Sequence, residues 1–361
     1  MLVLQTGSIF ASTKEGFVQD YFIIGQGLAG SVLALKLLEQ GKRIHVFESP
    51  QPNTSSTIAA GLMNPVTGKR MTVSWRADEM FPIASRFYQK QESLLNTSFF
   101  YPMPVYRVFS SVGEQNDWTA KMHESRYSRF ISPDAIEALD ATQFRNPFGG
   151  LKVTGGGRLD VPQLMDATRK RLLEEGCFSL RHISAEDIQT IGEGYSIGEH
   201  QARRVVFCTG VDMDNWGFLP FTPMKGEVLE VEAPQHDREK IVVGGCFFSP
   251  KTNGNFYVGA TYDWRNLNLV RTEKAKLELL ERLGRFVEGN PKVVDHRVGV
   301  RPAVKDRRPM LGQHPEMKGY YLLGGFGSKG VSMAPYLADC LIAHMEHGQE
   351  LDVELNLRRF L

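Results

Sequence analysis

The order of apolar and polar positions near the start of the chain predicts a strand, a helix and a second strand. Tyr21–Ile24 is a short apolar run of the kind found in buried strands. Three closely spaced glycines follow it, and then apolar positions recur at helical spacing to form one face: Leu33, Ala34, Leu37 and Leu38. Gly41 is placed to end this helix, and Arg43–Phe47 reads as the second strand. The pattern therefore predicts a βαβ unit.

Helical periodicity and helix-terminating residues predict four more helices along the chain. We expect them over residues 78–95, 160–176, 272–287 and 331–347. Asp160 is suited to cap the second of these, Pro162 suits its first turn, and Gly176 suits its end.

Strand-like segments lie between the helices. Glu227–Glu232, Cys246–Ser249 and Phe256–Ala260 follow one another, and the turn pair Asn253 and Gly254 separates the last two. This spacing favours an antiparallel sheet in the middle of the chain. Arg203–Cys208 and the strand at 320–323 return to the pattern of alternating strands and helices.

The fold class we predict is α/β, with a Rossmann-like domain that is discontinuous in sequence and an inserted domain built on an antiparallel sheet. Residues 18–85, 151–216 and 296–361 are assigned to the first domain, and residues 86–150 and 217–295 to the second. Residues 1–17 are read as an N-terminal extension.

Composition is that of an ordinary soluble protein, with 42% hydrophobic and 23% charged residues and a formal net charge of +1. This balance gives no strong global attraction to nucleic acid or anionic lipid. The cysteines Cys177, Cys208, Cys246 and Cys340 are widely spaced, so we expect buried thiols and no metal site. No run of 18 apolar residues appears, which predicts a cytoplasmic protein without a membrane segment.

The three glycines of the first turn carry the first chemical signal. Gly25, Gly27 and Gly30 have the GxGxxG spacing that lets backbone approach a pyrophosphate at a helix N-terminus. Glu48, at the end of the second strand, is placed to bind a ribose hydroxyl. A plain βαβ unit without a nucleotide is the alternative. The presence of the strand, the helix, the second strand and the terminal acid together favours a dinucleotide site.

A second glycine-rich loop precedes the last helix, and its N-terminus is again suited to an anion. The segments AAGLMNP (59–65), GVRPAVKDRRPMLG (299–312) and GGFGSKGVSMAP (324–335) join the GxGxxG unit in one pattern. With this combination the chain resembles the D-amino-acid oxidase superfamily of flavoproteins, of the glycine oxidase type, and its fold would then be the GR2-type FAD-binding fold. The C-terminal segment also resembles the oxidase half of MnmC-type bifunctional enzymes.

The resemblance implies non-covalent FAD, because no cysteine lies near residues 303–313, where a related branch attaches its cofactor. The residues that it places at the FAD, together with Gly210 at the end of a strand, are Gly25, Gly27, Leu28, Ala29, Gly30, Glu48, Ser49, Ala60, Gly61, Leu62, Met63, Gly210, Gly325, Phe326, Gly327, Ser328, Lys329, Gly330 and Val331. Lys329 would stabilise the negative charge of the reduced flavin.

Arg301 is the residue that the resemblance assigns to the substrate carboxylate, and its planar fork suits that task. Relatives carry a tyrosine hydroxyl in the segment matching 245–250, where this chain has Phe247 and Phe248. Tyr262 is placed to supply a polar group instead, or else to fill core. Arg297, Arg307 and Arg308 are read as solvated charges.

The activity implied by the resemblance is hydride transfer to FAD from the carbon next to nitrogen in a small amino acid or secondary amine. Water would hydrolyse the imine to an oxo acid, with oxygen as the expected acceptor and peroxide as product. The same chemistry on carboxymethylaminomethyl uridine in tRNA is the first alternative, with basic residues Lys69, Arg70 and Arg76 in its favour. An NAD-dependent dehydrogenase and a catalytically silent flavin-binding module are the others.

Overall fold

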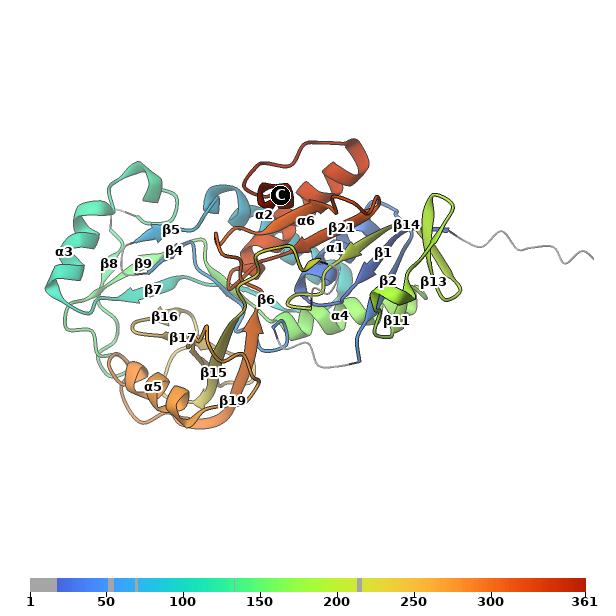
Figure 1. Cartoon of the computed structure of the whole chain (residues 1–361). Helices are drawn as coiled ribbons and strands as arrows, with labels where there is room; N and C mark the ends of the chain where they lie inside the picture. The colour runs from blue at the N-terminus through green and yellow to red at the C-terminus, as the bar shows by residue number, and fades with distance from the viewer. Residues whose placement is uncertain (1–17, 51–54, 69–70, 133, 213–215) are drawn as a thin grey trace, which may run out of the picture.

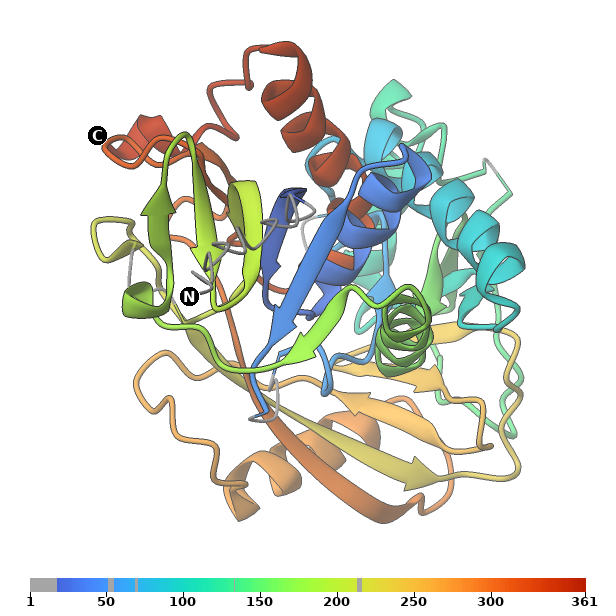
Figure 2. The same cartoon turned by 90° about the vertical axis from the view of Figure 1, so that its right-hand side faces the viewer.

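A computed structural model of the chain describes residues 18–50, 55–68, 71–132, 134–212 and 216–361. The predicted extension at 1–17 and the basic residues Lys69 and Arg70 lie outside the described residues. Figures 1 and 2 show two lobes, each built around a large sheet.

The first sheet has a parallel centre in the order β11-β2-β1-β14-β21. Strands β20 and β13 pair antiparallel with β21 and β14, and β12 pairs with β13. The strands are β1 (Val18–Ile24), β2 (Ile44–Glu48), β11 (Phe178–Leu180), β12 (Gln189–Ile191), β13 (Gly194–Ile197), β14 (His200–Phe207), β20 (Met310–Gln313) and β21 (Tyr320–Gly324).

Helices pack on one face of this sheet and on one another (Figure 2). They are α1 (Leu28–Glu39), α2 (Ala77–Leu95), α4 (Val161–Glu174) and α6 (Gly330–His347). In β1, Tyr21 and Ile23 are buried in the core cluster that includes the helices, whereas Phe22 and Ile24 belong to a second cluster with Trp216. Alternate side chains of a strand point to opposite faces, so both faces of the sheet are buried.

The predicted helices are confirmed, with one difference in length. The Asp160 carboxylate accepts a hydrogen bond from the Gln163 amide at 3.3 Å and so caps α4 as expected. Helix α5 spans Glu273–Leu283 and stops at Gly284, before the predicted end at Val287. Glycine is a poor helix former, and the chain turns there, with the Phe286 and Val287 amides donating hydrogen bonds to the Leu283 carbonyl.

The second sheet is mostly antiparallel, as predicted, in the order β19-β15-β18-β17-β16-β7-β9-β8. Helix α5 packs against β15 and β18, while α3 (Val112–Lys121) lies at the far end of this lobe (Figure 1). The strands are β7 (Val105–Val108), β8 (Ile136–Glu137), β9 (Gly150–Val153), β15 (Met224–Glu232), β16 (Ile241–Val243), β17 (Phe247–Pro250), β18 (Phe256–Gly259) and β19 (Lys292–Arg301).

Residues 151–153 and 296–301 were assigned to the first domain from the sequence, yet they pair within this second sheet. The domain limits stay a prediction. The pairing places Arg301 at the end of a strand of the second sheet, where the chain passes from one lobe to the other.

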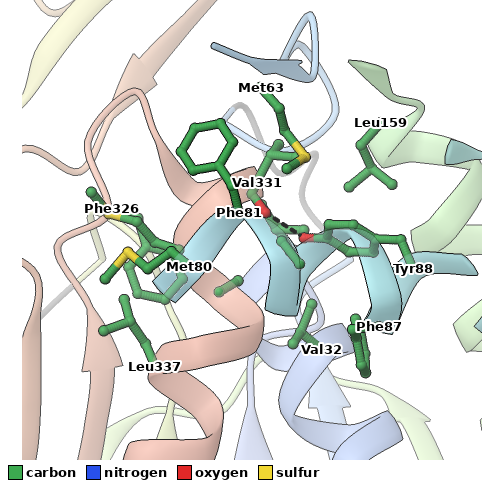
Figure 3. Close-up of a cluster of buried hydrophobic side chains, with 14 of the residues drawn as sticks. Val32, Met63, Met80, Phe81, Phe87, Tyr88, Leu159, Phe326, Val331 and Leu337 are labelled. Carbon is green, nitrogen blue, oxygen red and sulfur yellow. Dashed lines mark hydrogen bonds between the residues drawn. The ribbon is translucent and has the colours of Figure 1, made fainter. Parts of the chain in front are cut away.

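Short strands and a buried cluster connect the two lobes. A three-stranded sheet consists of β3 (Leu62–Met63), β10 (Gly157–Leu159) and β6 (Phe100–Pro102), and a two-stranded sheet consists of β4 (Val66–Thr67) and β5 (Thr72–Val73). Figure 3 shows Met63 and Leu159 of this region beside Phe81 and Tyr88 of α2. The Tyr88 hydroxyl donates to the Val331 carbonyl at 2.7 Å, which fixes the start of α6 against α2. No described helix has the length and apolar content needed to cross a membrane.

Candidate functional site

The parallel strands of the first sheet end at one edge, and four predicted cofactor residues follow or end them. Gly25 follows β1, Glu48 ends β2, Gly210 lies just beyond β14 and Gly325 follows β21. The carboxyl edge of a parallel sheet is where ligands bind in open α/β folds. The sheet therefore brings together residues from three distant parts of the sequence.

Two of the three fingerprint glycines are required by local geometry. Gly25 has a φ of 97°, and a Cβ on Gly30 would lie 1.9 Å from the Gly25 carbonyl oxygen. Gly27 is the N-cap of α1 and has no side chain to cap this end. The Leu28 amide donates to the Ser56 hydroxyl at 3.0 Å, and the first turn holds no acidic residue. This helix start, with its positive dipole end and no acidic residue in its first turn, is suited to an anion.

Glu48 lies next to this turn and is buried. Its carboxylate accepts a hydrogen bond from the Gln26 amide. Burial raises the pKa of Glu48, while the Gln26 amide and Arg169 act in the opposite direction. Gln26 also accepts a hydrogen bond from Arg169 Nε at 2.9 Å and donates to the Met165 carbonyl at 2.8 Å. Sequence reasoning missed Gln26 and Arg169, because their contacts join α4 to a turn more than 130 residues away.

The second glycine loop meets both the first turn and the end of β19. A Cβ on Gly330 would lie 3.2 Å from Leu28 Cδ2, so the starts of α1 and α6 are in contact. The Gly327 amide donates to the Pro302 carbonyl at 3.0 Å, directly after Arg301. The N-cap residue of α6 makes no side-chain cap, and the first turn of α6, like that of α1, holds no acidic residue.

Lys329 is the N-cap residue of α6 and is partly buried. Its ammonium donates to the Ser74 hydroxyl at 3.0 Å, and Ser74 in turn donates to the Asn64 carbonyl. Burial, and then the nearby Arg308, lower the pKa of Lys329. No carboxylate lies within 4.0 Å of Lys329 in the described part of the chain. Ser74 was not singled out from the sequence.

The predicted flavin loop at 60–63 lies between the lobes. Gly61 has a φ of 75°, and a Cβ there would lie 1.7 Å from the Leu159 carbonyl oxygen, so no other residue fits without a shift. Ala60 packs with Phe247, Val228 and other residues of the second sheet. The loop thus contacts the second sheet on one side and, through Met63, the buried cluster of Figure 3 on the other.

Arg301 and Tyr262 are brought together by the structure. The Arg301 guanidinium lies 5.0 Å from the centre of the Tyr262 ring and donates to the Thr261 carbonyl at 3.3 Å. Burial lowers the pKa of Arg301, and Tyr262 opposes that shift. Among described residues, no carboxylate lies within 4.0 Å of the guanidinium. A partly buried cation without a protein counter-ion is suited to an anionic ligand.

Comparison with known proteins assigns the family. The sequence model of the "DAO: FAD dependent oxidoreductase" family matches residues 20–344. The chain belongs to this family. FAD is therefore its cofactor, and the fold prediction is confirmed.

Individual relatives of the family are distant. Glycine oxidase of Geobacillus kaustophilus is 21% identical over 93% of this chain and 95% of its own length. A crystal structure of glycine oxidase from Bacillus cereus superposes with a TM-score of 0.77 at 20% identity and covers 92% of this chain and 96% of that one. The MnmC protein of Marinobacter nauticus, named for tRNA 5-methylaminomethyl-2-thiouridine biosynthesis, is 24% identical over 88% of this chain. The chain spans about half of that relative, 54% of its length.

The described residues fit the FAD of this family. Two helix starts without acidic residues in their first turns meet at the carboxyl edge of the sheet, which suits the negatively charged pyrophosphate. Glu48 lies beside the first of these helix starts, where it can accept a hydrogen bond from a ribose hydroxyl. Lys329, without a described carboxylate partner, suits negative charge on the ring system.

Phe247 and Phe248, which stand where the resemblance led us to expect a tyrosine, lie on opposite faces of β17. Phe248 is buried on the face covered by α5 and stacks on Phe256 at 4.1 Å. Phe247 lies on the other face, over Gly259 and in the cluster with Ala60. Phe247 is thus the residue next to the flavin loop, and it offers no hydroxyl.

The reading of three arginines as solvated charges is wrong for two of them. Arg297 Nε bonds to Asp295 at 2.7 Å, and Arg308 Nε bonds to Glu354 at 2.9 Å. Arg307 is exposed. Glu354 lies far along the chain from Arg308, so no local signal marked that pair. Asp295 stands two residues before Arg297, on the same face of β19, and this spacing was a signal that sequence reasoning missed.

Arg76, offered from the sequence as a free basic residue, is also engaged. It pairs with Asp352 and donates to the Tyr336 hydroxyl at 2.8 Å. Its charge is therefore already balanced by the C-terminal segment. Arg76 then adds little to any attraction of a polyanion.

The four cysteines are free thiols; Cys208 and Cys246 are buried, as predicted, whereas Cys177 and Cys340 are half-buried. Burial raises the pKa of Cys177 to about 11 and that of Cys246 to about 12, and it also raises those of Cys208 and Cys340. Such thiols are poor nucleophiles at neutral pH. The described residues contain no group of three His, Cys, Asp or Glu side chains arranged to hold a metal ion.

Proposed function

We propose that this chain oxidises a small amino acid or secondary amine at the carbon next to nitrogen, and that Arg301 holds the substrate carboxylate. The observation that carries the proposal is the partly buried Arg301 guanidinium with no described carboxylate partner. Arg301 is the last residue of β19, and the next residue, Pro302, accepts a hydrogen bond from Gly327 in the glycine loop before α6. A carboxylate bound there lies between the second sheet and the proposed flavin site.

The remaining roles follow from the contacts. Tyr262 closes one side of the guanidinium, and Phe247 and Ala60 give the neighbouring wall an apolar character. The residues proposed to hold the non-covalent FAD are those of the first turn, Glu48 and Ser49, the loop at 60–63, Gly210, and the loop at 325–331. FAD held there would supply a hydride acceptor for the carbon next to nitrogen, so that the amine becomes an imine. Water then hydrolyses the imine to an oxo acid and releases the nitrogen as ammonia or a primary amine. Oxygen is the proposed acceptor.

The test is the visible spectrum of the purified holoenzyme under anaerobic conditions. Glycine, sarcosine, D-alanine and D-proline are added in turn, and bleaching of the flavin bands marks a substrate. Admission of air should restore the bands and release peroxide. If no amino or imino acid bleaches the flavin while the protein is fully loaded with FAD, the proposal fails.

A second candidate is oxidation of a carboxymethylaminomethyl uridine in tRNA. The observation in its favour is the loop after β18, where Tyr262, beside Arg301, and Trp264 are 59% and 53% exposed, and where the following Arg265 is also exposed. Exposed aromatic rings flanked by arginine suit stacking with bases. Bleaching only by the modified nucleoside or its tRNA, with tRNA binding that weakens steeply with salt, would favour this candidate.

A further inference from the structure

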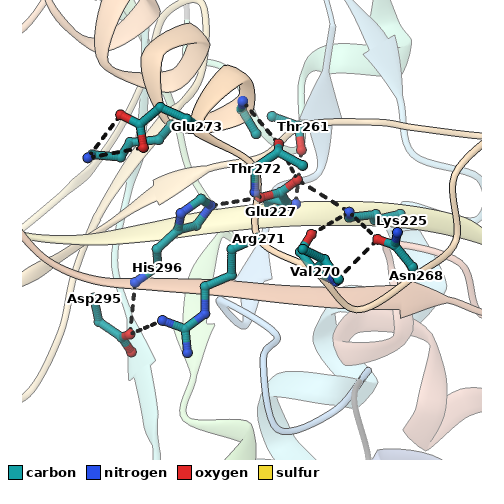
Figure 4. A network of polar contacts seen from close by, with 12 residues as sticks. Lys225, Glu227, Thr261, Asn268, Val270, Arg271, Thr272, Glu273, Asp295 and His296 are labelled. Carbon is teal, nitrogen blue, oxygen red and sulfur yellow. Dashed lines mark hydrogen bonds and ion pairs between the residues drawn. The ribbon is translucent and has the colours of Figure 1, made fainter.

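Strand β15 shows different chemistry on its two faces at three consecutive residues. Lys225 and Glu227 lie on one face, in the buried polar network of Figure 4. Gly226, between them, lies on the opposite face, because successive residues of a strand alternate. On that face the guanidinium of Arg301 lies directly over Gly226.

The path of the Arg301 side chain explains why residue 226 is a glycine. In the sheet, Arg301 pairs with Met224 and not with Gly226. The side chain must therefore cross β15 diagonally to reach the Thr261 carbonyl on the far side. A Cβ on Gly226 would lie 2.2 Å from both Nη1 and Nη2 of Arg301 and 2.3 Å from Cζ, far inside contact distance.

Backbone hydrogen bonds to β15 hold the segment 261–263, which the Arg301 side chain reaches, in place. The Thr261 amide donates a hydrogen bond to the Glu227 carbonyl at 3.2 Å. The Asp263 amide donates to the Lys225 carbonyl at 3.0 Å, and the Lys225 amide donates to the Asp263 carbonyl at 2.9 Å. Tyr262, between them, therefore lies opposite Gly226. Lys225 also donates to Asn268 and to the Val270 carbonyl, so the following loop is fixed as well (Figure 4).

We propose that Gly226 is a positioning residue that sets the location of the Arg301 guanidinium, and with it the carboxylate-binding point of the site. Gly226, the Thr261 carbonyl and the Tyr262 ring enclose the guanidinium on three sides and leave the remaining side to the ligand. This inference rests on the proposed function, since it needs Arg301 to bind a carboxylate.

The variant Gly226→Ala tests the position of the Arg301 guanidinium without disturbing the stability of the fold. The atoms that a Cβ would meet are the end of a flexible side chain, so the backbone can stay in place while the guanidinium moves. Gly226 does not have a positive φ, so alanine adds no backbone strain. Gly217→Ala is the matched control, because nothing lies within 4 Å of a Cβ there and its φ is not positive either.

The experiment titrates the holoenzyme with acetate and benzoate, and with acetamide and benzamide as uncharged probes, while the flavin spectrum is recorded. Displacement of a positioning group by about 1 Å can cost on the order of 100-fold, so we expect Gly226→Ala to weaken carboxylate binding by about 10- to 100-fold. Amide binding, FAD content and thermal stability should stay as in the wild type, and Gly217→Ala should bind both probes normally. In an Arg301→Met background, Gly226→Ala should have no further effect.

Each outcome separates this inference from the proposed function. Carboxylate binding that Arg301→Met does not weaken, or that the wild type lacks, overturns the role of Arg301 and the inference with it. Binding that Arg301→Met weakens and Gly226→Ala leaves unchanged overturns the inference alone. Equal weakening of carboxylate and amide binding by Gly226→Ala would show a general distortion of the site, which also overturns it.

Discussion

Arg297 and Arg301 lie four residues apart on the same face of β19, yet their surroundings differ completely. Arg297 is placed among Asp295, Glu230 and the Tyr257 ring. Burial acts to lower its pKa, but these partners outweigh burial and raise it. Arg301 has only the Thr261 carbonyl and the Tyr262 ring as recorded partners in the described chain, and burial lowers its pKa.

The difference separates a charge that has counter-ions within the protein from the charge that we propose binds a ligand. A buried charge normally carries its counter-ion within the protein, because desolvation is expensive. Arg297 obeys this rule and Arg301 does not, although one strand supplies both. The free energy that a counter-ion would contribute at Arg301 is therefore left for a ligand.

Replacing the two arginines in turn gives the largest expected effect. Arg301→Met should lower kcat/KM for an amino-acid substrate by about 10²- to 10⁴-fold, because two charge-assisted hydrogen bonds of about 1.5–3 kcal/mol each are lost. Arg297→Met should change kcat/KM only a few fold. Steady-state oxygen consumption measures both, and similar losses in the two variants would erase the distinction.

For the free energy of unfolding we expect the opposite ranking: removal of a charge paired within the protein should cost more than removal of Arg301. Lys225 is 1% exposed and lies 3.6 Å from the Glu227 carboxylate. Lys225→Met leaves this buried carboxylate with the Thr272 hydrogen bonds and His296 at 2.8 Å but without the lysine, and should lower the free energy of unfolding by up to about 3–5 kcal/mol. Arg301→Met should lower it by less than about 1 kcal/mol, since no described carboxylate is left behind.

Urea denaturation checks this prediction. The Lys225→Met/Glu227→Gln double variant provides the control, because it should be less destabilised than the sum of the single changes. Additive losses would mean that Lys225 and Glu227 do not act as a pair.

Lys329 provides a smaller test at the cofactor. Its removal in Lys329→Met should lower the two-electron reduction potential of the flavin by about 20–40 mV, or roughly 1–2 kcal/mol of charge stabilisation. Lys305→Met is the matched control, since Lys305 is exposed. Equal potentials in the wild type and both variants would remove Lys329 from the proposed site.

The smallest effect is expected in acid. The pKa of Glu230 is lowered because bonds from Lys251 and two asparagines outweigh burial, and that of Asp295 is lowered because Arg297 outweighs burial. Carboxylates with lowered pKa values stabilise the fold above their unfolded values of about 4, and this contribution is lost as the pH falls through the folded values.

Arg297→Met should therefore reduce the acid dependence of the free energy of unfolding below about pH 4, by less than about 1 kcal/mol because these groups are partly solvated. Denaturation curves between pH 2 and 6 measure it. A steeper acid dependence in the variant than in the wild type would contradict the assignment of Arg297 as their partner.

Local signals were enough to predict much of the fold. The GxGxxG turn and the Asp160 cap depend on residues a few positions apart, so their spacing is visible in the chain itself. The family, its FAD and the antiparallel sheet of the second lobe were also predicted and are confirmed.

The surroundings of the charges were not predictable, because they depend on strand pairing. Arg308 meets Glu354 and Arg76 meets Asp352 only after the C-terminal segment folds back on the loop near residue 75. Gly226 meets Arg301 through a register that no motif encodes. The residues assigned to the cofactor and substrate remain predictions.

The contact between the first residues of α1 and α6 also governs when the protein becomes complete during synthesis. Gly30 emerges from the ribosome early, whereas the loop before α6 follows about 300 residues later, which is roughly 15–60 s at about 5–20 residues per second. For that interval the nascent chain has one helix start exposed at the sheet edge and lacks the other. Because both helix starts are proposed to hold the cofactor, we expect cofactor loading only after the loop before α6 has been synthesised.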